Sequence, residues 1–155
     1  MQMKNRIKHP KVFISYAWGS QEHDEKVIAL ATNLKGDGVD VVFDKWQLKE
    51  GNDTFKFMEK SVLDESITNV LILIDPIYAK KANERAGGVG TETQIISTEV
   101  YNKVEQRKFI PVVFERDAEG NVCKPQYLKG LLHFDLSMPD TYDTEYQRMV
   151  RTLYG

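Results

Sequence analysis

The chain has 155 residues, 41% of them hydrophobic and 28% charged, with a formal net charge of −2. This size and composition are typical of one globular domain, and the near-neutral charge argues against a nucleic-acid-binding surface. The apolar runs are only strand-sized, the N-terminus lacks the apolar core of a signal peptide, and the single cysteine cannot form an internal disulfide, so we expect a cytoplasmic protein without a membrane contact.

Strand-like and helix-like segments alternate along the chain. The strands are short apolar runs, whereas the helices carry apolar residues at three- and four-residue spacing, as between Val27 and Leu34. In chain order we predict a strand at 12–16, a helix at 21–35, a strand at 39–43, a helix at 54–64, a strand at 69–74, a helix at 91–106, strands at 109–114 and 133–136, and a helix at 142–153. We predict long loops at Asp44–Asp53 and Asp75–Gly90.

This alternation predicts an α/β fold with a doubly wound, parallel sheet of five strands and helices on both faces. The runs at 69–74 and 109–114 are apolar almost throughout, which is typical of strands buried on both faces. Ligands of such sheets bind beyond the carboxyl ends of the strands, near the point where the strand order reverses. We therefore expect the loops at 16–20, 44–53 and 75–90 to form the walls of a site.

Several segments in this order resemble the TIR superfamily, in particular its bacterial TIR and SEFIR-like branch. They are Val12–Tyr16, Val42–Gly51 with the BB loop, Phe57–Ser61, Leu71–Tyr78, Asn83–Gly90, Ile95–Tyr101 and Lys108–Val113. The resemblance covers nearly the whole chain and implies one domain over residues 1–155 with the flavodoxin-like TIR fold. The chain ends directly after an amphipathic helix, which is compatible with a natural end or with a following, fused sensor domain of a longer effector protein.

The resemblance implies two uses of this fold, and the fold alone does not choose between them. The first, which we favour from the sequence, is an NAD⁺ glycohydrolase of bacterial antiphage immunity. It would be activated by self-association and would release nicotinamide and ADP-ribose or a cyclic or variant form. NAD⁺ would then be a substrate, and we expect no permanently bound cofactor. The alternative is a non-catalytic adaptor that signals through TIR–TIR contacts of the BB loop, Asp44–Asp53.

Cleavage of NAD⁺ calls for a carboxylate, because positive charge develops on the ribose as neutral nicotinamide leaves. Glu99 is the first candidate, since on a helix at 91–106 it would lie on the side of the buried Ile95 and Ile96. An ion pair with Lys103 on the surface would equally account for Glu99 and would give it no functional role. Glu92 is the alternative carboxylate, although an acid in the first turn of a helix also stabilises the helix dipole. Many TIR enzymes carry a Trp-Cys pair before this glutamate, and its absence here leaves the position open.

Residues that follow the first two strands are the candidates for substrate binding. An aromatic ring there can stack on a base, and a carboxylate can accept hydrogen bonds from ribose hydroxyls. Packing within the loops explains the same side chains equally well. The candidates are Tyr16, Ala17, Trp18, Asp44, Trp46 and Gln47.

Other site chemistries find little support in the sequence. His9, His23 and His133 have no ligand spacing, so we expect no metal site. The glycines at 87–90 lack the Lys-Ser/Thr of a phosphate-binding loop. Asp75 ends a strand as a phospho-accepting aspartate does, but the acidic pair that such receivers carry after strand one is replaced by Ser15–Ala17.

Overall fold

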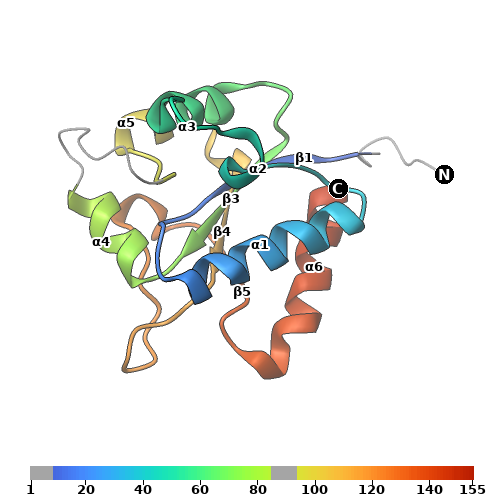
Figure 1. Ribbon diagram of the computed structural model, residues 1–155. Helices are drawn as coiled ribbons and strands as arrows, with labels where there is room; N and C mark the ends of the chain where they lie inside the picture. Colours follow the sequence, from blue (N-terminus) through green and yellow to red (C-terminus); the bar gives the residue numbers. More distant parts are fainter. Residues whose placement is uncertain (1–8, 85–93) are drawn as a thin grey trace.

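The computed structural model describes residues 9–84 and 94–155 (Figure 1). Five strands form one parallel sheet in the order β2-β1-β3-β4-β5. They are β1 (Lys11–Ser15), β2 (Asp40–Val42), β3 (Asn69–Ile74), β4 (Phe109–Val113) and β5 (Phe134–Asp135). This is the flavodoxin-like order, and it confirms the predicted fold class. The order reverses between β1 and β3, so the crevice at their carboxyl ends is where this fold binds ligands.

Helices cover both faces of the sheet (Figure 1). On one face lie α1 (Gln21–Gly36) and α6 (Tyr142–Tyr154), and on the other lie α3 (Thr54–Leu63), α4 (Pro76–Glu84) and α5 (Thr98–Tyr101). The short helix α2 (Asp44–Gln47) directly follows β2. Three 3-10 turns complete the described elements, at Gln106–Lys108, Pro139–Thr141 and Gln126–Leu128.

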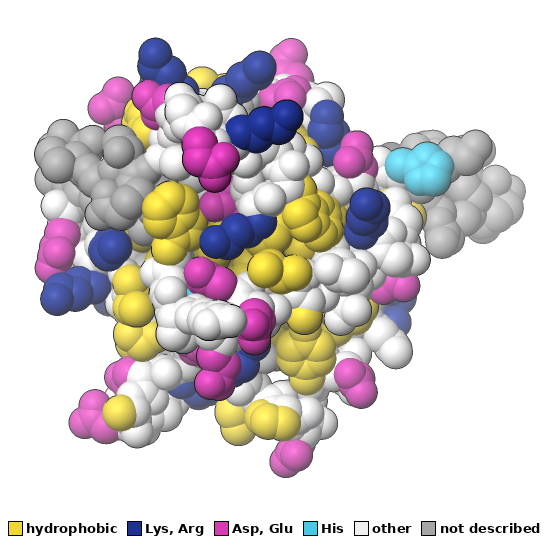
Figure 2. Space-filling view, in the orientation of Figure 1, with side chains coloured by type: hydrophobic (Ala, Val, Ile, Leu, Met, Phe, Trp, Pro, Cys, Tyr) yellow, Lys and Arg dark blue, Asp and Glu magenta, His cyan; other side chains and the backbone are white. Residues whose placement is uncertain are grey.

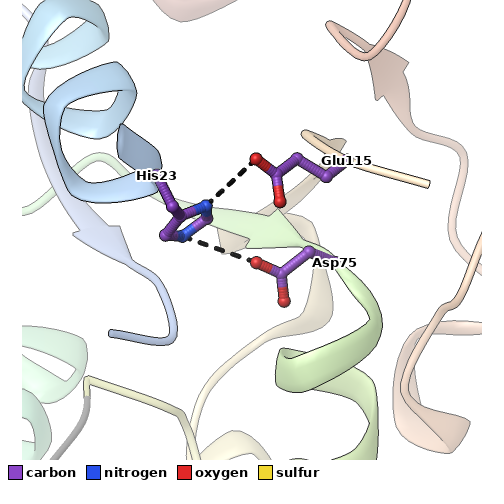
Figure 3. A group of neighbouring side chains, drawn as sticks. All are labelled: His23, Asp75 and Glu115. Carbon is purple, nitrogen blue, oxygen red and sulfur yellow. Dashed lines mark ion pairs between the residues drawn. The ribbon is translucent and has the colours of Figure 1, made fainter. Parts of the chain in front are cut away.

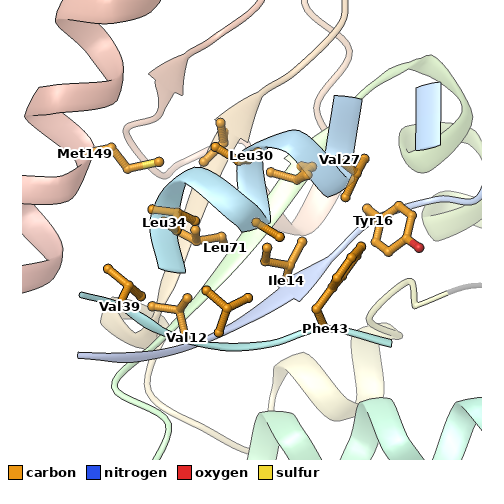
Figure 4. Packing of buried hydrophobic residues seen from close by; sticks show 14 of the residues in the cluster. Val12, Ile14, Tyr16, Val27, Leu30, Leu34, Val39, Phe43, Leu71 and Met149 are labelled. Atoms are coloured by element: carbon orange, nitrogen blue, oxygen red, sulfur yellow. The ribbon is translucent and has the colours of Figure 1, made fainter. Parts of the chain in front are cut away.

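The apolar alternation of the strands separates two hydrophobic clusters. In β3, Leu71 and Leu73 face the cluster under α1 and α6, while Val70, Ile72 and Ile74 face the cluster under α3, α4 and α5. Because both faces are covered, this strand has no polar side and forms the continuous apolar run that the sequence shows. Figure 4 shows the first cluster, in which side chains of α1 lie over those of β1 and β3.

The caps and the buried side chains of helix α1 fix its position against the sheet. Ser20 is its N-cap and accepts a hydrogen bond from the His23 backbone amide at 3.1 Å. Gly38, with φ of +89°, follows the helix in a conformation that glycine adopts at low cost and turns the chain into β2. Burial of Val27, Leu30 and Leu34 contributes about 1.5–3 kcal/mol per side chain before entropy is deducted. The first turn of α1 is thereby fixed beside the carboxyl ends of the strands.

The predicted helix at 91–106 is wrong for the residues that the structure describes. Gln94–Ser97 has no regular structure, α5 spans only Thr98–Tyr101, and residues 91–93 lie outside the described part. The backbone of this segment is held by side chains instead: Ser15 Oγ donates to Gln94 O, the Ile96 amide donates to Tyr78 Oη at 3.1 Å, and Tyr127 Oη donates to Ile96 O at 2.5 Å. These tertiary hydrogen bonds replace the helical ones.

Both predicted loops contain helices. Asp75 accepts a hydrogen bond from the Tyr78 amide at 2.7 Å, and Pro76 occupies the first helical position, so α4 begins where we predicted a loop. In the BB loop, the Leu48 amide donates to Asp44 O at 2.8 Å and closes the single turn of α2. Within residues 9–84 and 94–155, no helix combines the length and the apolar character that a bilayer span requires.

Candidate functional site

The aspartate at the carboxyl end of β2 anchors the BB loop. Asp44 is only 4% exposed, and its two carboxylate oxygens accept hydrogen bonds from Tyr16 Oη at 2.8 Å and from Trp18 Nε1 at 2.9 Å. Burial, together with the neighbouring Asp44 carboxylate, raises the pKa of Tyr16 far above its ordinary value. Tyr16 therefore keeps its proton and remains a donor to Asp44. The structure brings these three predicted site residues together, with each oxygen of Asp44 occupied by a partner from the chain itself.

Trp46 presents an aromatic surface on the outside of this cluster. Its side chain is 41% exposed, and its ring packs edge-on against Phe43 with 5.3 Å between the ring centroids. Lys35 Nζ lies 5.4 Å from the centre of the same ring, within range of a cation–π interaction. Gln47 is also a predicted site residue, and its side-chain Oε1 accepts a hydrogen bond from the Phe43 amide at 2.7 Å. Trp46 is thus fixed in place but open to solvent.

The candidate carboxylate Glu99 takes no part in the hydrogen bonds that join Tyr16, Trp18 and Asp44. It sits in the first turn of α5 with its side chain exposed, so the prediction that it faces the buried side is wrong. The physical reason is the missing helix: Ile95 and Ile96 are buried by an irregular segment, and the helical spacing to Glu99 does not apply. The neighbours of Glu99 belong to the second hydrophobic cluster, whereas Tyr16 and Trp18 belong to the first. Glu92 lies outside the described residues.

A second polar cluster, which sequence spacing did not predict, lies at the carboxyl edge (Figure 3). His23 of α1 lies between two acids: its Nε2 is 3.5 Å from Asp75 Oδ2, and its Nδ1 is 3.3 Å from Glu115 Oε2. The predicted site residue Ala17 is buried, and its carbonyl oxygen lies 3.1 Å from the same Nε2. Asp75 follows β3 and Glu115 follows β4, so the fold alone joins residues that are far apart in the sequence.

Charge and burial shape this cluster. His23 and Asp75 are 7% and 3% exposed, whereas Glu115 is half-buried. Burial raises the pKa of Asp75, opposed by the hydrogen bond from the Tyr78 amide and by the neighbouring His23. Lys26 Nζ also reaches Glu115 Oε2, at 3.8 Å. The cluster borders an open cleft of about 490 Å³, lined by Gly19, Ser20, Glu22, His23, Asp75, Pro76, Ile77, Glu115, Arg116, Asp117 and Ala118.

Comparison with known families decides the identity of the domain. The SEFIR domain family matches residues 10–148. The chain belongs to the SEFIR family. A crystal structure of a prokaryotic SEFIR domain superposes with a TM-score of 0.82 at 39% sequence identity, covering 94% of this chain and 99% of that one. The resemblance to the SEFIR-like branch of the TIR superfamily is confirmed.

A more distant neighbour shows how far the fold extends. The TIR domain of the Toll-related receptor TRR-2 from Hydra magnipapillata superposes with a TM-score of 0.59 at 17% identity, covering 93% of this SEFIR domain and 98% of that chain. At this identity the likeness shows the shared fold and nothing further. A comparison with curated proteins finds no match.

Proposed function

We propose that this SEFIR domain is a protein-interaction module in signalling, which assembles with further copies through its BB loop, Asp44–Asp53. Membership of a family of signalling interaction domains supports this proposal. The observation that carries it is Trp46, a large aromatic ring held on a rigid base and left open to solvent. Tryptophan is among the residues that most often dominate the energy of protein interfaces.

The surroundings of Trp46 are suited to a reversible protein–protein interface. Lys45, Lys49 and Glu50 of the same loop are exposed, and Lys45 pairs with Asp24 of α1 at 3.8 Å. Figure 2 shows acidic and basic side chains interspersed over this view of the molecule, with hydrophobic side chains between them. Mixed charges of this kind give an association its register and orientation more than its strength. We place the assembly in the cytoplasm, and a fused or partner sensor domain would bring the copies together.

Trp46→Ala tests the interaction surface. We expect the association constant between copies to fall by at least about 30-fold, the loss typical of a tryptophan that dominates an interface. Sedimentation velocity over a range of concentrations measures this change, and circular dichroism checks the fold. Leu132→Ala is the matched control, because Leu132 is 94% exposed and lies outside the BB loop. Equal association of wild type and Trp46→Ala would contradict the role of this surface.

A second candidate function is cleavage of NAD⁺, which the TIR-like sequence segments imply. The ring of Trp18, which follows β1, favours it, because β1 borders the crevice where this fold binds ligands. Trp46 follows the edge strand β2, and its ring is open to stack on a base. The carboxylate would be Glu99 or, alternatively, Glu92. Asp44 would take part only by sharing the oxygens that Tyr16 and Trp18 already occupy.

Release of nicotinamide from NAD⁺ by concentrated protein tests this second function. We expect Glu99→Ala to lower the turnover at least about 100-fold, as loss of a group that stabilises transition-state charge does. Because Glu99 is exposed, its removal leaves no core cavity, and the variant should keep the stability of the wild type. Loss of turnover in Glu92→Ala alone would transfer the role to Glu92. Wild-type protein without turnover at any concentration would leave the interaction module as the function.

A further inference from the structure

His23, Asp75 and Glu115 form a group of side chains that neither proposed function uses. They come from three elements that meet where the strand order reverses: the first turn of α1 and the residues after β3 and β4 (Figure 3). Each offers one ligand atom, and these three atoms all lie within 4.8 Å of one another. Two of the three side chains are almost completely buried, so the group is built into the fold and is not a chance gathering of surface acids.

We propose that His23, Asp75 and Glu115 bind one divalent transition-metal ion, with the remaining coordination positions open to the cleft. Ligand atoms at about 2.0–2.2 Å from one ion lie roughly 3–3.5 Å from each other in a tetrahedral arrangement. The separation of 3.5 Å between His23 Nε2 and Asp75 Oδ2 already matches that spacing. Ala17 O lies 3.1 Å from the same Nε2, so metal binding would replace this hydrogen bond. Glu115, the half-buried member, lies 3.3 Å from the other ring nitrogen, Nδ1, and 3.8 Å from Lys26 Nζ, so its side chain would have to turn toward Nε2 to complete the third position.

The type of ion follows from the donor atoms. One imidazole nitrogen with two carboxylate oxygens is softer than the all-oxygen sets of Ca²⁺ and Mg²⁺ and harder than the thiolate sets of structural zinc. Mn²⁺ and Zn²⁺ accept such mixed nitrogen and oxygen ligands. With three protein ligands, the open positions would hold water or an oxygen ligand such as phosphate from the cleft of about 490 Å³.

The charges around the cluster also favour a cation, beyond Lys26, whose Nζ lies 3.8 Å from Glu115 Oε2. Glu22 and Asp117 line the same cleft as Asp75 and Glu115. Arg116 lines it too, but its guanidinium group donates to Asp135 at 2.6 Å and to Gly120 O at 3.0 Å. A buried carboxylate is costly unless it is paired, and a divalent ion would pair both acids at once. The competing explanation is that the His23 ring bridges the two acids without any metal.

The proposal is tested by titrating untagged, chelator-treated protein with Mn²⁺. The electron paramagnetic resonance signal measures the free Mn²⁺, and Zn²⁺ is then added as a competitor. We expect one Mn²⁺ per chain, displaced by Zn²⁺. Asp75→Asn and Glu115→Gln should each weaken binding at least about 10-fold, because a ligand matters no less than the outer groups that orient it. Asp75→Asn keeps the side-chain oxygen that caps α4, so this variant should fold. Glu115→Gln changes a half-buried side chain and provides a second, independent variant.

Glu22→Gln is the matched control, because it removes the same charge from the same cleft without touching the three ligands. Its affinity should equal that of the wild type. Binding that falls equally in Glu22→Gln and Asp75→Asn would show general attraction to an acidic cleft and overturn the proposal. Wild-type protein that binds neither ion, but loses stability on Asp75→Asn, would also overturn it and leave His23 as a metal-free bridge.

Discussion

Asp44→Ala should lower the free energy of unfolding by about 3 kcal/mol, because it leaves two hydrogen-bond donors without their acceptor. Tyr16 Oη is fully buried, and burial, the largest cause of its raised pKa, remains when Asp44 is removed, so it cannot ionise to relieve the loss. Trp18 is half-buried and regains a water partner more readily. Urea denaturation with unchanged slope measures the change. Asp53→Ala, which removes the exposed N-cap of α3, is the control and should cost about 1 kcal/mol.

A double-mutant cycle separates the Asp44–Tyr16 hydrogen bond from the rest of the anchor. Tyr16→Phe removes the hydroxyl donor and keeps the ring against Phe43, with which it packs at 5.6 Å between centroids. If the bond between them carries the loss, Tyr16→Phe should cost little once Asp44 is already alanine. Fully additive losses would mean that Asp44 acts through Trp18 or through the start of α2. Because Asp44 begins the BB loop, the same substitution should also weaken self-association.

The sheet could be predicted from the sequence because its signal is local. Strands such as Asn69–Ile74 are apolar on both faces, and Val27, Leu30 and Leu34 mark the buried side of α1. The region after β3 could not be predicted in the same way. Ile95 and Ile96 have the spacing of a helix face, but Ser15, Tyr78 and Tyr127 hold their backbone through contacts from distant parts of the chain. The prediction for the side chain of Glu99 is wrong because these tertiary hydrogen bonds, and not helical ones, hold the backbone before it.

The candidate site, like the fold, could be predicted from the sequence only in part. Tyr16, Trp18 and Asp44 follow two neighbouring strands at one edge of the sheet, and the structure places them in contact with one another. Their role in binding a substrate stays a prediction. That Asp44 is a buried acceptor and not a free ligand could not be predicted, because it depends on side-chain directions. The cluster of His23, Asp75 and Glu115 gives no signal in the sequence, because its members come from three different elements and share no spacing along the chain. The sequence does carry one sign of the local structure around Asp75: an aspartate followed by proline, directly after a strand, is typical of the first residues of a helix.

Gly51→Pro should abolish concentration-dependent assembly while leaving the core folded. The turn at Lys49–Asn52 has the Asn52 amide 3.0 Å from Lys49 O, and Gly51 at its third position has φ of +93°, as in a type II turn. Proline fixes φ near −65°, so it cannot occupy this position, and the tip of the BB loop must change shape. No other side chain lies against Gly51, which confines the damage to the turn. Light scattering across concentrations measures assembly, and thermal unfolding measures the core.

Gly120→Pro is the matched control for this substitution. Gly120 has φ of +83°, and its amide donates to Asp117 O at 2.9 Å in another exposed turn, so proline disrupts that turn both through the backbone angle and through loss of this donor. Its assembly should equal that of the wild type. Gly51→Ala should fall between wild type and Gly51→Pro, because alanine tolerates a positive φ at a cost of about 1–2 kcal/mol. If Gly51→Pro assembles as the wild type does, the shape of the BB loop does not control self-association, and the interface must lie on another face of the domain.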